Sequence, residues 1–240
     1  MISKKTQIDY KPDYEAGEVV LIDKSQRKSS FDCVYKVRKA IEVKKVGHAG
    51  TLDPSATGLV IVCTGRMTKE ISSIQGQGKN YIGIISLGKT TASYDSETPF
   101  ESVKDFSGIT NEDIFRTRDC FIGIINQIPP MYSAVKIHGK ALYKYARKGV
   151  EIERKSREAV ITKFEITGID LPDIHFDINC TKGTYIRVIA HDFGHKLGCG
   201  AYLKSLRRMS IGDYNVKDAF SIEEFKEFAK QNSPVVAEIN

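Results

Sequence analysis

Short apolar runs typical of buried strands recur along the 240-residue chain, but helical patterns do not follow them in regular alternation. The strand-like runs occupy residues 19–22, 59–63, 81–87, 159–169 and 174–180. Parallel strands need a long crossover connection, usually a helix, whereas antiparallel strands need only a short turn. This order therefore favours an α+β fold with a largely antiparallel sheet over a doubly wound fold.

Helices are indicated by start signals and by apolar spacing. Ser30 and Thr110 are candidate N-caps, and Ser221 begins a sequence typical of a capping box. Residues 186–197 place apolar side chains on one helical face. Short helices are also expected at residues 67–74 and 141–148, with an irregular segment at 128–140.

Residues 47–58, with the sequence GHAGTLDPSATG, are predicted to form a loop that leads into the buried strand at 59–63. Glycine can adopt backbone angles that bulkier residues avoid, so such a loop can point the carboxylate of Asp53 into a cleft. An Asp-Pro pair in a loop is more often only a turn. The physical character of these residues alone leaves both interpretations open.

Positive charge is concentrated in one segment. The chain has 36 basic and 30 acidic residues, and residues 136–157 contain eight basic residues against Glu151 and Glu153. Tyr143 and Tyr145 lie within this segment. Lysine and arginine can contact phosphates while tyrosine stacks on bases, so the segment is a candidate RNA-binding surface. A solvated helix face is the alternative interpretation.

Other features narrow the class of protein. The five cysteines form no CxxC pair, which favours reduced and mostly buried thiols over a disulfide framework or a cysteine zinc site. His191 and His195 are four residues apart but have no third ligand at a suitable spacing. No run of eighteen apolar residues is present, and the N-terminus lacks the apolar core of a signal peptide. We therefore expect a cytoplasmic protein with no membrane segment.

The segment at 47–58 closely resembles the signature of the bacterial tRNA pseudouridine-55 synthases, differing from its usual form only at Ala49 and Ser55. Further similar segments follow in the order found in that family, and together they extend from about residue 17 to about residue 228. They are KNY at 79–81, SLGKTTASYD at 86–95, IPPMYSAVKIHGKALYKYARKG at 128–149 and CTKGTYIRVIAHDFGHKLGCGAYLKSLRR at 180–208.

The resemblance implies an isomerase that converts uridine 55 in the T loop of tRNA to pseudouridine after base flipping. Asp53 would be the catalytic nucleophile, Arg187 would pair with its carboxylate, and Tyr81 would stack on the target base. We predict substrate binding by His48, Lys24, Asp95, Tyr185, Leu206, Lys136 and Lys140. Lys24 could contact either phosphate or the catalytic loop. The resemblance implies no cofactor, no metal, a monomer, and no obligate partner besides the T stem-loop of tRNA.

The resemblance also implies the pseudouridine-synthase fold, with a central, mainly antiparallel mixed sheet, flanking helices and a central cleft around Asp53. We expect one catalytic domain over residues 1–240, with an RNA-gripping insertion at about 130–157. The usual C-terminal RNA-binding module is expected to be absent or vestigial. Ser25 and Arg27 depart from the proline and glycine of the family's N-terminal turn.

Three alternative functions stay open at this point. A glycoside hydrolase or N-glycosidase would also place a carboxylate at an anomeric carbon, but it normally needs a second carboxylate, for which Asp95 is the candidate. A non-catalytic RNA-binding module would explain the basic segment but not the Asp53 loop. A subunit of an RNA-guided pseudouridylation particle is the third.

Overall fold

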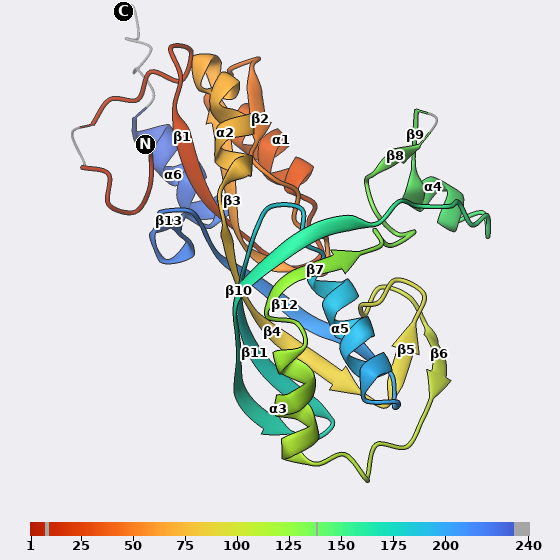
Figure 1. Cartoon of the computed structure of the whole chain (residues 1–240). Helices are drawn as coiled ribbons and strands as arrows, with labels where there is room; N and C mark the ends of the chain where they lie inside the picture. Colours follow the sequence, from red (N-terminus) through yellow and green to blue (C-terminus); the bar gives the residue numbers. More distant parts are fainter. Residues whose placement is uncertain (8–9, 138, 233–240) are drawn as a thin grey trace, which may run out of the picture. The chain divides into compact units, whose positions relative to one another are not determined.

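The computed structural model describes residues 1–7, 10–137 and 139–232 (Figure 1). It has the expected α+β composition with a mainly antiparallel sheet. The chain divides into two compact units, the first formed by Met1–Gln77 with Arg207–Asn240 and the second by Gly78–Leu206. No helix in the described part of the chain is long and apolar enough to span a bilayer.

The sheet of the first unit is built on two apolar strands. β1 (Val19–Lys24) pairs antiparallel with β3 (Thr57–Thr64), which also pairs with β2 (Val46–His48). The last residues of β12 (Ala201–Ile211) add a short parallel pairing, in which Arg208 is opposite Gly58. The remaining elements of this unit are α1 (Ser30–Ile41), η1 (Gly65–Glu70), α2 (Ile71–Gly76), β13 (Tyr214–Asn215), η2 (Val216–Asp218) and α6 (Ile222–Gln231).

The core of the first unit comes from the predicted strand at 59–63, which is fully buried because every side chain of LVIVC is apolar. Leu59, Ile61 and Cys63 pack with Leu21 of β1 and Ile211 of β12 in one cluster. Burial of such side chains contributes roughly 1.5–3 kcal/mol each. The strand that leaves the Asp53 loop is therefore rigidly anchored.

The second unit has an antiparallel ladder in the order β4-β11-β10-β7, and the first residues of β12 lie beside β4. β11 alternates buried and half-buried residues, as expected for a strand with one face in the core. Phe164 and Phe176 from the ladder pack with Phe121 and Phe193.

The bounds of the second unit's strands and helices complete the fold. The ladder strands are β4 (Lys79–Leu87), β7 (Gly123–Gln127), β10 (Arg157–Asp170) and β11 (Asp173–Cys180). The other elements are β5 (Lys89–Thr91), β6 (Phe100–Val103), α3 (Asn111–Asp119), β8 (Lys136–Ile137), β9 (Lys140–Ala141), α4 (Leu142–Ala146) and α5 (Ile186–Lys196).

Most local expectations are confirmed, with three corrections. Thr110 and Ser221 cap their helices in full capping boxes. Ser29, not Ser30, is the N-cap of α1, because its side chain accepts the N–H of Asp32 and leaves Ser30 in the first turn. The expected helix at 67–74 is instead the end of η1 followed by α2, and the irregular segment at 128–140 includes β8 and the first residue of β9. The single-domain organisation stays a prediction.

Candidate active site

Asp53 lies in a tight turn between two anchored strands of the first unit. The carbonyl oxygen of Asp53 accepts the N–H of Ala56 at 3.1 Å, which closes a four-residue turn with Pro54 at its second position. Proline favours this position because its φ angle is already near the required value. The half-buried Asp53 is preceded by Leu52, whose side chain is buried in the protein. The turn therefore holds the carboxylate at a defined place.

The side chain of Arg208 donates hydrogen bonds to the segment before Asp53. Its guanidinium group is buried and donates to the carbonyl oxygens of Gly50 at 3.2 Å, Thr51 at 3.3 Å and Leu59 at 2.8 Å. Gly58 permits this approach, because a Cβ atom there would lie 2.3 Å from the carbonyl oxygen of Arg208. The planar fork of arginine suits several acceptors at fixed positions. One side chain thus links both ends of the loop.

Lys24 supports the segment after Asp53. Its side chain is fully buried, and its ammonium group donates to the carbonyl oxygens of Pro54 at 3.4 Å and of Ala56. The same group donates to Ser25 and Lys28 within the β1–α1 connection. Of the two roles predicted for Lys24, this geometry favours contact with the loop that carries Asp53.

The first turn of α1 is a third support. The Ser30 hydroxyl accepts the N–H of Leu52 at 2.8 Å and lies 3.2 Å from the Leu52 carbonyl oxygen. The backbone N–H of Arg27 donates to the carbonyl oxygen of Pro54 at 2.8 Å. Arg27 has a φ of 63°, in the left-handed region that glycine normally favours. Arg27 thus makes this contact from a backbone conformation that glycine adopts more readily.

These supports make the surroundings of Asp53 electropositive. Burial lowers the pKa of the Lys24 ammonium, while the negative charge of Asp53 acts in the opposite direction. Burial also lowers the pKa of His48; a backbone hydrogen bond at Gly50 opposes that shift and the guanidinium of Arg208 adds to it. The two buried cations bind backbone carbonyl oxygens on both sides of Asp53 along the chain. A carboxylate held in such a turn can act as a nucleophile.

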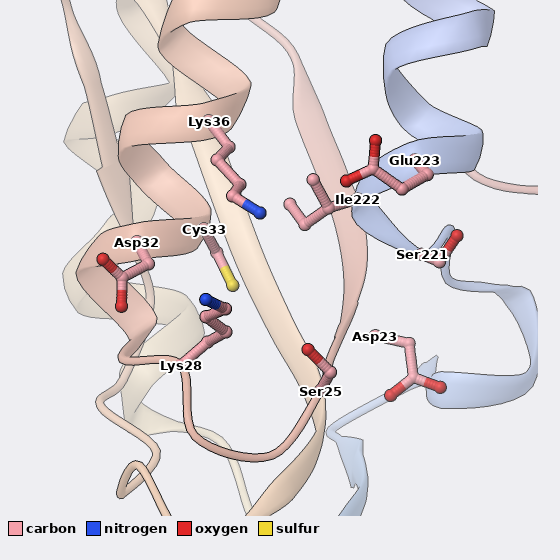
Figure 2. Close-up of a pocket in the computed structure, with 9 residues that line it drawn as sticks. All are labelled: Asp23, Ser25, Lys28, Asp32, Cys33, Lys36, Ser221, Ile222 and Glu223. Carbon is pink, nitrogen blue, oxygen red and sulfur yellow. The ribbon is translucent and has the colours of Figure 1, made fainter.

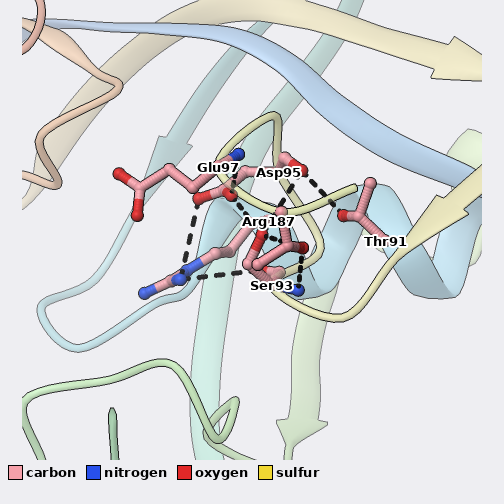
Figure 3. Close-up of polar contacts among 6 residues, drawn as sticks. Thr91, Ser93, Asp95, Glu97 and Arg187 are labelled. Carbon is pink, nitrogen blue, oxygen red and sulfur yellow. Dashed lines mark hydrogen bonds and ion pairs between the residues drawn. The ribbon is translucent and has the colours of Figure 1, made fainter. Parts of the chain in front are cut away.

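In the second unit Arg187 and Asp95 form a buried ion pair (Figure 3). Their closest charged atoms are 3.7 Å apart, and the guanidinium also donates to the Ser93 carbonyl oxygen at 3.4 Å. The Asp95 carboxylate accepts the Ser93 hydroxyl and the N–H of Glu97. Burial raises the pKa of Asp95, and the Ser93 hydroxyl and Arg187 oppose that shift. The predicted pairing of Arg187 with Asp53 stays a prediction.

Tyr81, predicted to stack on the target base, and Tyr185, predicted to bind substrate, lie in different elements of the second unit. Tyr81 is buried in β4, opposite Ile178 of β11. Tyr185 is the N-cap residue of α5, and its backbone exchanges two hydrogen bonds with the side chain of Gln127, at 2.9 and 3.1 Å. Leu206 is half-buried at the last position of β12 that belongs to this unit. The Gln127 contact fixes the backbone beside Arg187.

The basic segment folds as a small β-hairpin followed by α4. Lys136 is exposed on β8, and the ammonium of Lys140 lies 4.4 Å from the ring centroid of Tyr145. The guanidinium of Arg147 lies 5.4 Å from the ring of Tyr143. Cations and aromatic rings therefore alternate on this segment, as phosphate contact and base stacking require.

Sequence reasoning missed Arg208 and Ser30 as supports of the loop. Arg208 carried one signal, since an arginine in a strand next to apolar residues must satisfy a buried charge. Ser30 carried none, because a serine at a helix start is usually a cap. The ring centroid of His191 lies 4.0 Å from that of Tyr94, with the two planes tilted by 30°, and its Nδ1 lies 3.1 Å from the Asp192 carboxylate.

Comparison with solved structures defines the class of fold. The chain superposes on a chain of a Cbf5–Nop10–Gar1 complex with a TM-score of 0.69 and 22% identity, covering 97% of this chain and 63% of that one. A chain of an H/ACA ribonucleoprotein bound to a substrate RNA gives a TM-score of 0.66, also at 22% identity, with 89% and 53% covered. The present chain thus spans between half and two thirds of those chains. This likeness shows the pseudouridine-synthase fold.

Sequence comparison is more specific. Residues 38–186 match the N-terminal domain of the TruB family pseudouridylate synthases, and residues 187–237 match the tRNA pseudouridylate synthase B C-terminal domain. The chain is 47% identical over 222 residues to tRNA pseudouridine synthase B of Flavobacterium johnsoniae, covering 90% of this chain and 97% of the relative. It is 49% identical over 214 residues to the protein of that name from Chlorobaculum tepidum, covering 87% and 89%. This chain belongs to the TruB family of pseudouridylate synthases.

Proposed function

We propose that this enzyme isomerises uridine 55 in the T loop of tRNA to pseudouridine, with Asp53 as the nucleophile. The observation that carries the proposal is the support of the Asp53 turn by two buried cations, with Arg208 bound to the backbone before Asp53 and Lys24 to the backbone after it. The curated relatives that are 41–49% identical over most of the chain are named tRNA pseudouridine synthase B.

The proposed reaction is an isomerisation without change of oxidation state. The bond between ribose C1′ and uracil N1 breaks, the base rotates, and a bond forms between C1′ and C5. The C5 proton leaves and N1 gains a proton, so atoms and electrons balance. Asp53 supplies the nucleophile, and the buried cations hold the backbone of the turn that carries it.

Recognition of the RNA is assigned to the second unit and to His48. The uridine must leave the stack before its C1′ and C5 can react, and an extruded base can stack on aromatic rings such as Tyr81 and Tyr185. Lys136 and Lys140 are assigned to the phosphates. Each phosphate contact releases counterions, so affinity should fall as salt is raised.

The test is release of tritium from C5 of the uridines in a T-arm transcript. The native protein should release one equivalent, and Asp53→Asn should release none while still binding the RNA. Asp105→Asn is a matched control, because Asp105 also lies in a loop and accepts local hydrogen bonds from Ser107. That variant should retain the native rate.

A transcript with cytidine at position 55 tests the position of the modified base. The equivalent of tritium that the native protein releases from the uridine transcript should no longer be released. Free uracil in the product would support an N-glycosidase instead. Binding by the native protein without tritium release would support a non-catalytic RNA-binding module, and either result would overturn the proposal.

A further inference from the structure

The solvent face of α1 carries two exposed aromatic side chains. Phe31 is 63% exposed and Tyr35 is 52% exposed, whereas Val34 and Val37 on the opposite face are buried. Residues four apart on a helix are neighbours, so the two aromatic side chains start from adjacent positions on the helix surface. The guanidinium of Arg38 lies 6.0 Å from the ring centroid of Tyr35. The arrangement joins flat apolar rings to a cation.

The segment around these rings is strongly basic. Residues 27–45 contain two acidic residues, Asp32 and Glu42, against seven basic ones, a density of positive charge similar to that at 136–157. The Asp32 carboxylate accepts the N–H of Ser29 at 2.7 Å and its hydroxyl at 2.8 Å, in the capping box of α1. The basic residues are Arg27, Lys28, Lys36, Arg38, Lys39, Lys44 and Lys45.

A pocket of about 250 Å³ lies beside this face, between α1 and the start of α6 (Figure 2). Lys28 and Lys36 line it, and neither ammonium is within 4 Å of a carboxylate in the part of the chain that the structure describes. Three carboxylates in the wall already have partners. Asp23 accepts two hydrogen bonds from Arg207, Glu223 pairs with Lys226 at 2.8 Å, and Asp32 accepts the capping hydrogen bonds of Ser29. The hydrogen bonds from Ser29, and after them the charges of Lys28 and Lys36, lower the pKa of Asp32, but neither lysine is fixed in an ion pair.

The start of α1 is bonded to the catalytic loop. Ser30 contacts Leu52, and Arg27 contacts Pro54, on either side of Asp53. A helix rises about 1.5 Å per residue, so Tyr35 and Arg38 are about 8 and 12 Å along the axis from Ser30. The hydrogen bonds of Ser30 and Arg27 therefore place the start of this helix next to the Asp53 turn.

We propose that Phe31, Tyr35, Arg38, Lys28 and Lys36 form a second RNA-binding surface, here called the α1 surface, for unpaired nucleotides of the same tRNA outside the modified position. Bases stack on the two rings, and phosphates meet the three cations. The α1 surface rests on the proposed function, because its occupant is the RNA held at Asp53. Its charge and exposed rings complement a flexible polyanion with unstacked bases.

The first experiment measures the dissociation constant of a fluorescently labelled full-length tRNA transcript by anisotropy. The double variant Phe31→Ala/Tyr35→Ala should bind roughly 5- to 100-fold more weakly for each stacked base that is lost. Phe31→Tyr/Tyr35→Phe keeps both rings and should bind like the native protein. Exposed side chains contribute little to folding, so thermal melting should be the same for all these proteins.

The matched control is Phe115→Ala on α3. Phe115 is also an exposed helical aromatic, 41% accessible, with the guanidinium of Arg118 5.6 Å from its ring. It should bind with native affinity, which would show that the loss is specific to α1. Lys28→Gln/Lys36→Gln should make the dependence of log affinity on log salt less steep by roughly 0.7 per lost phosphate contact.

Native affinity in the Phe31→Ala/Tyr35→Ala protein would overturn the α1 surface, as would an equal loss in Phe115→Ala. If the α1 surface bound a protein partner instead of RNA, the double variant would bind tRNA with native affinity. Tritium release by the native enzyme separates this inference from the proposed function. If the native enzyme releases tritium and the double variant binds RNA with native affinity, only the α1 surface is rejected. If the native enzyme releases no tritium and the double variant binds RNA more weakly, the isomerase is rejected.

Discussion

Arg208→Met tests whether the buried guanidinium holds the catalytic loop. Methionine retains most of the apolar volume but donates no hydrogen bonds, so three carbonyl oxygens lose their partner. Leu59 is fully buried, and an unsatisfied carbonyl there costs about 2 kcal/mol. Thr51 is exposed and Gly50 is half-buried, so water replaces much of the hydrogen bonding that their carbonyl oxygens lose. Each of these two lost hydrogen bonds costs about 0.5 kcal/mol.

The sum of about 3 kcal/mol predicts a loss of roughly 6–12 °C in melting temperature for a chain of this size. The rate should fall as well, because a displacement of about 1 Å in a catalytic group can cost about 100-fold. Tritium release is measured at 20 °C, well below the melting transition, so that unfolding does not contribute. Arg208→Lys keeps the charge but not the planar fork, and both losses should be intermediate.

Arg207→Met is the control from the neighbouring position. Arg207 pairs with Asp23, and both side chains are about one third exposed. Such pairs contribute about 0–1 kcal/mol, so this variant should melt within about 3 °C of the native protein and react at the native rate. A native melting temperature and rate in Arg208→Met, or losses of equal size in Arg207→Met, would refute the assigned role.

Two further changes separate local supports from bulk stability. Ser30→Ala loses the hydroxyl contacts with Leu52, so it should lower the free energy of unfolding by about 1 kcal/mol and slow tritium release. Ser29→Ala loses the helix cap, so it should lower the free energy of unfolding by about the same amount but release tritium at the native rate. Equal rates in both would contradict loop support by Ser30. Burial lowers the pKa of His48 in the folded state. The unfolded chain therefore binds more protons than the folded chain at pH values between that lowered pKa and about 6.5. The free energy of unfolding should fall as pH drops through this window. His48→Gln should flatten that part of the stability curve in urea titrations, and an unchanged slope would exclude His48 as its source.

The local sequence determined those parts of the fold that depend on neighbouring residues. The run LVIVC became the buried strand β3, because its side chains have no favourable place in water. Thr110 and Ser221 start helices, because each is followed three residues later by an acidic side chain that completes a capping box. The two adjacent serines at 29 and 30 satisfy the same local rule, so only the folded chain distinguishes the cap from the residue that contacts Leu52.

The tertiary structure alone decided what holds Asp53. The motif at 47–58 identified the aspartate, but its supports come from positions far away in the chain, with Arg208 about 150 residues after the loop carbonyls that it binds. The secondary-structure preferences of neighbouring residues do not predict such contacts. The contacts form only when β1, β3 and β12 have paired and their buried cations need hydrogen-bond acceptors. The same holds for Arg187 and Asp95, which are 92 residues apart and meet because burial of either charge requires a partner.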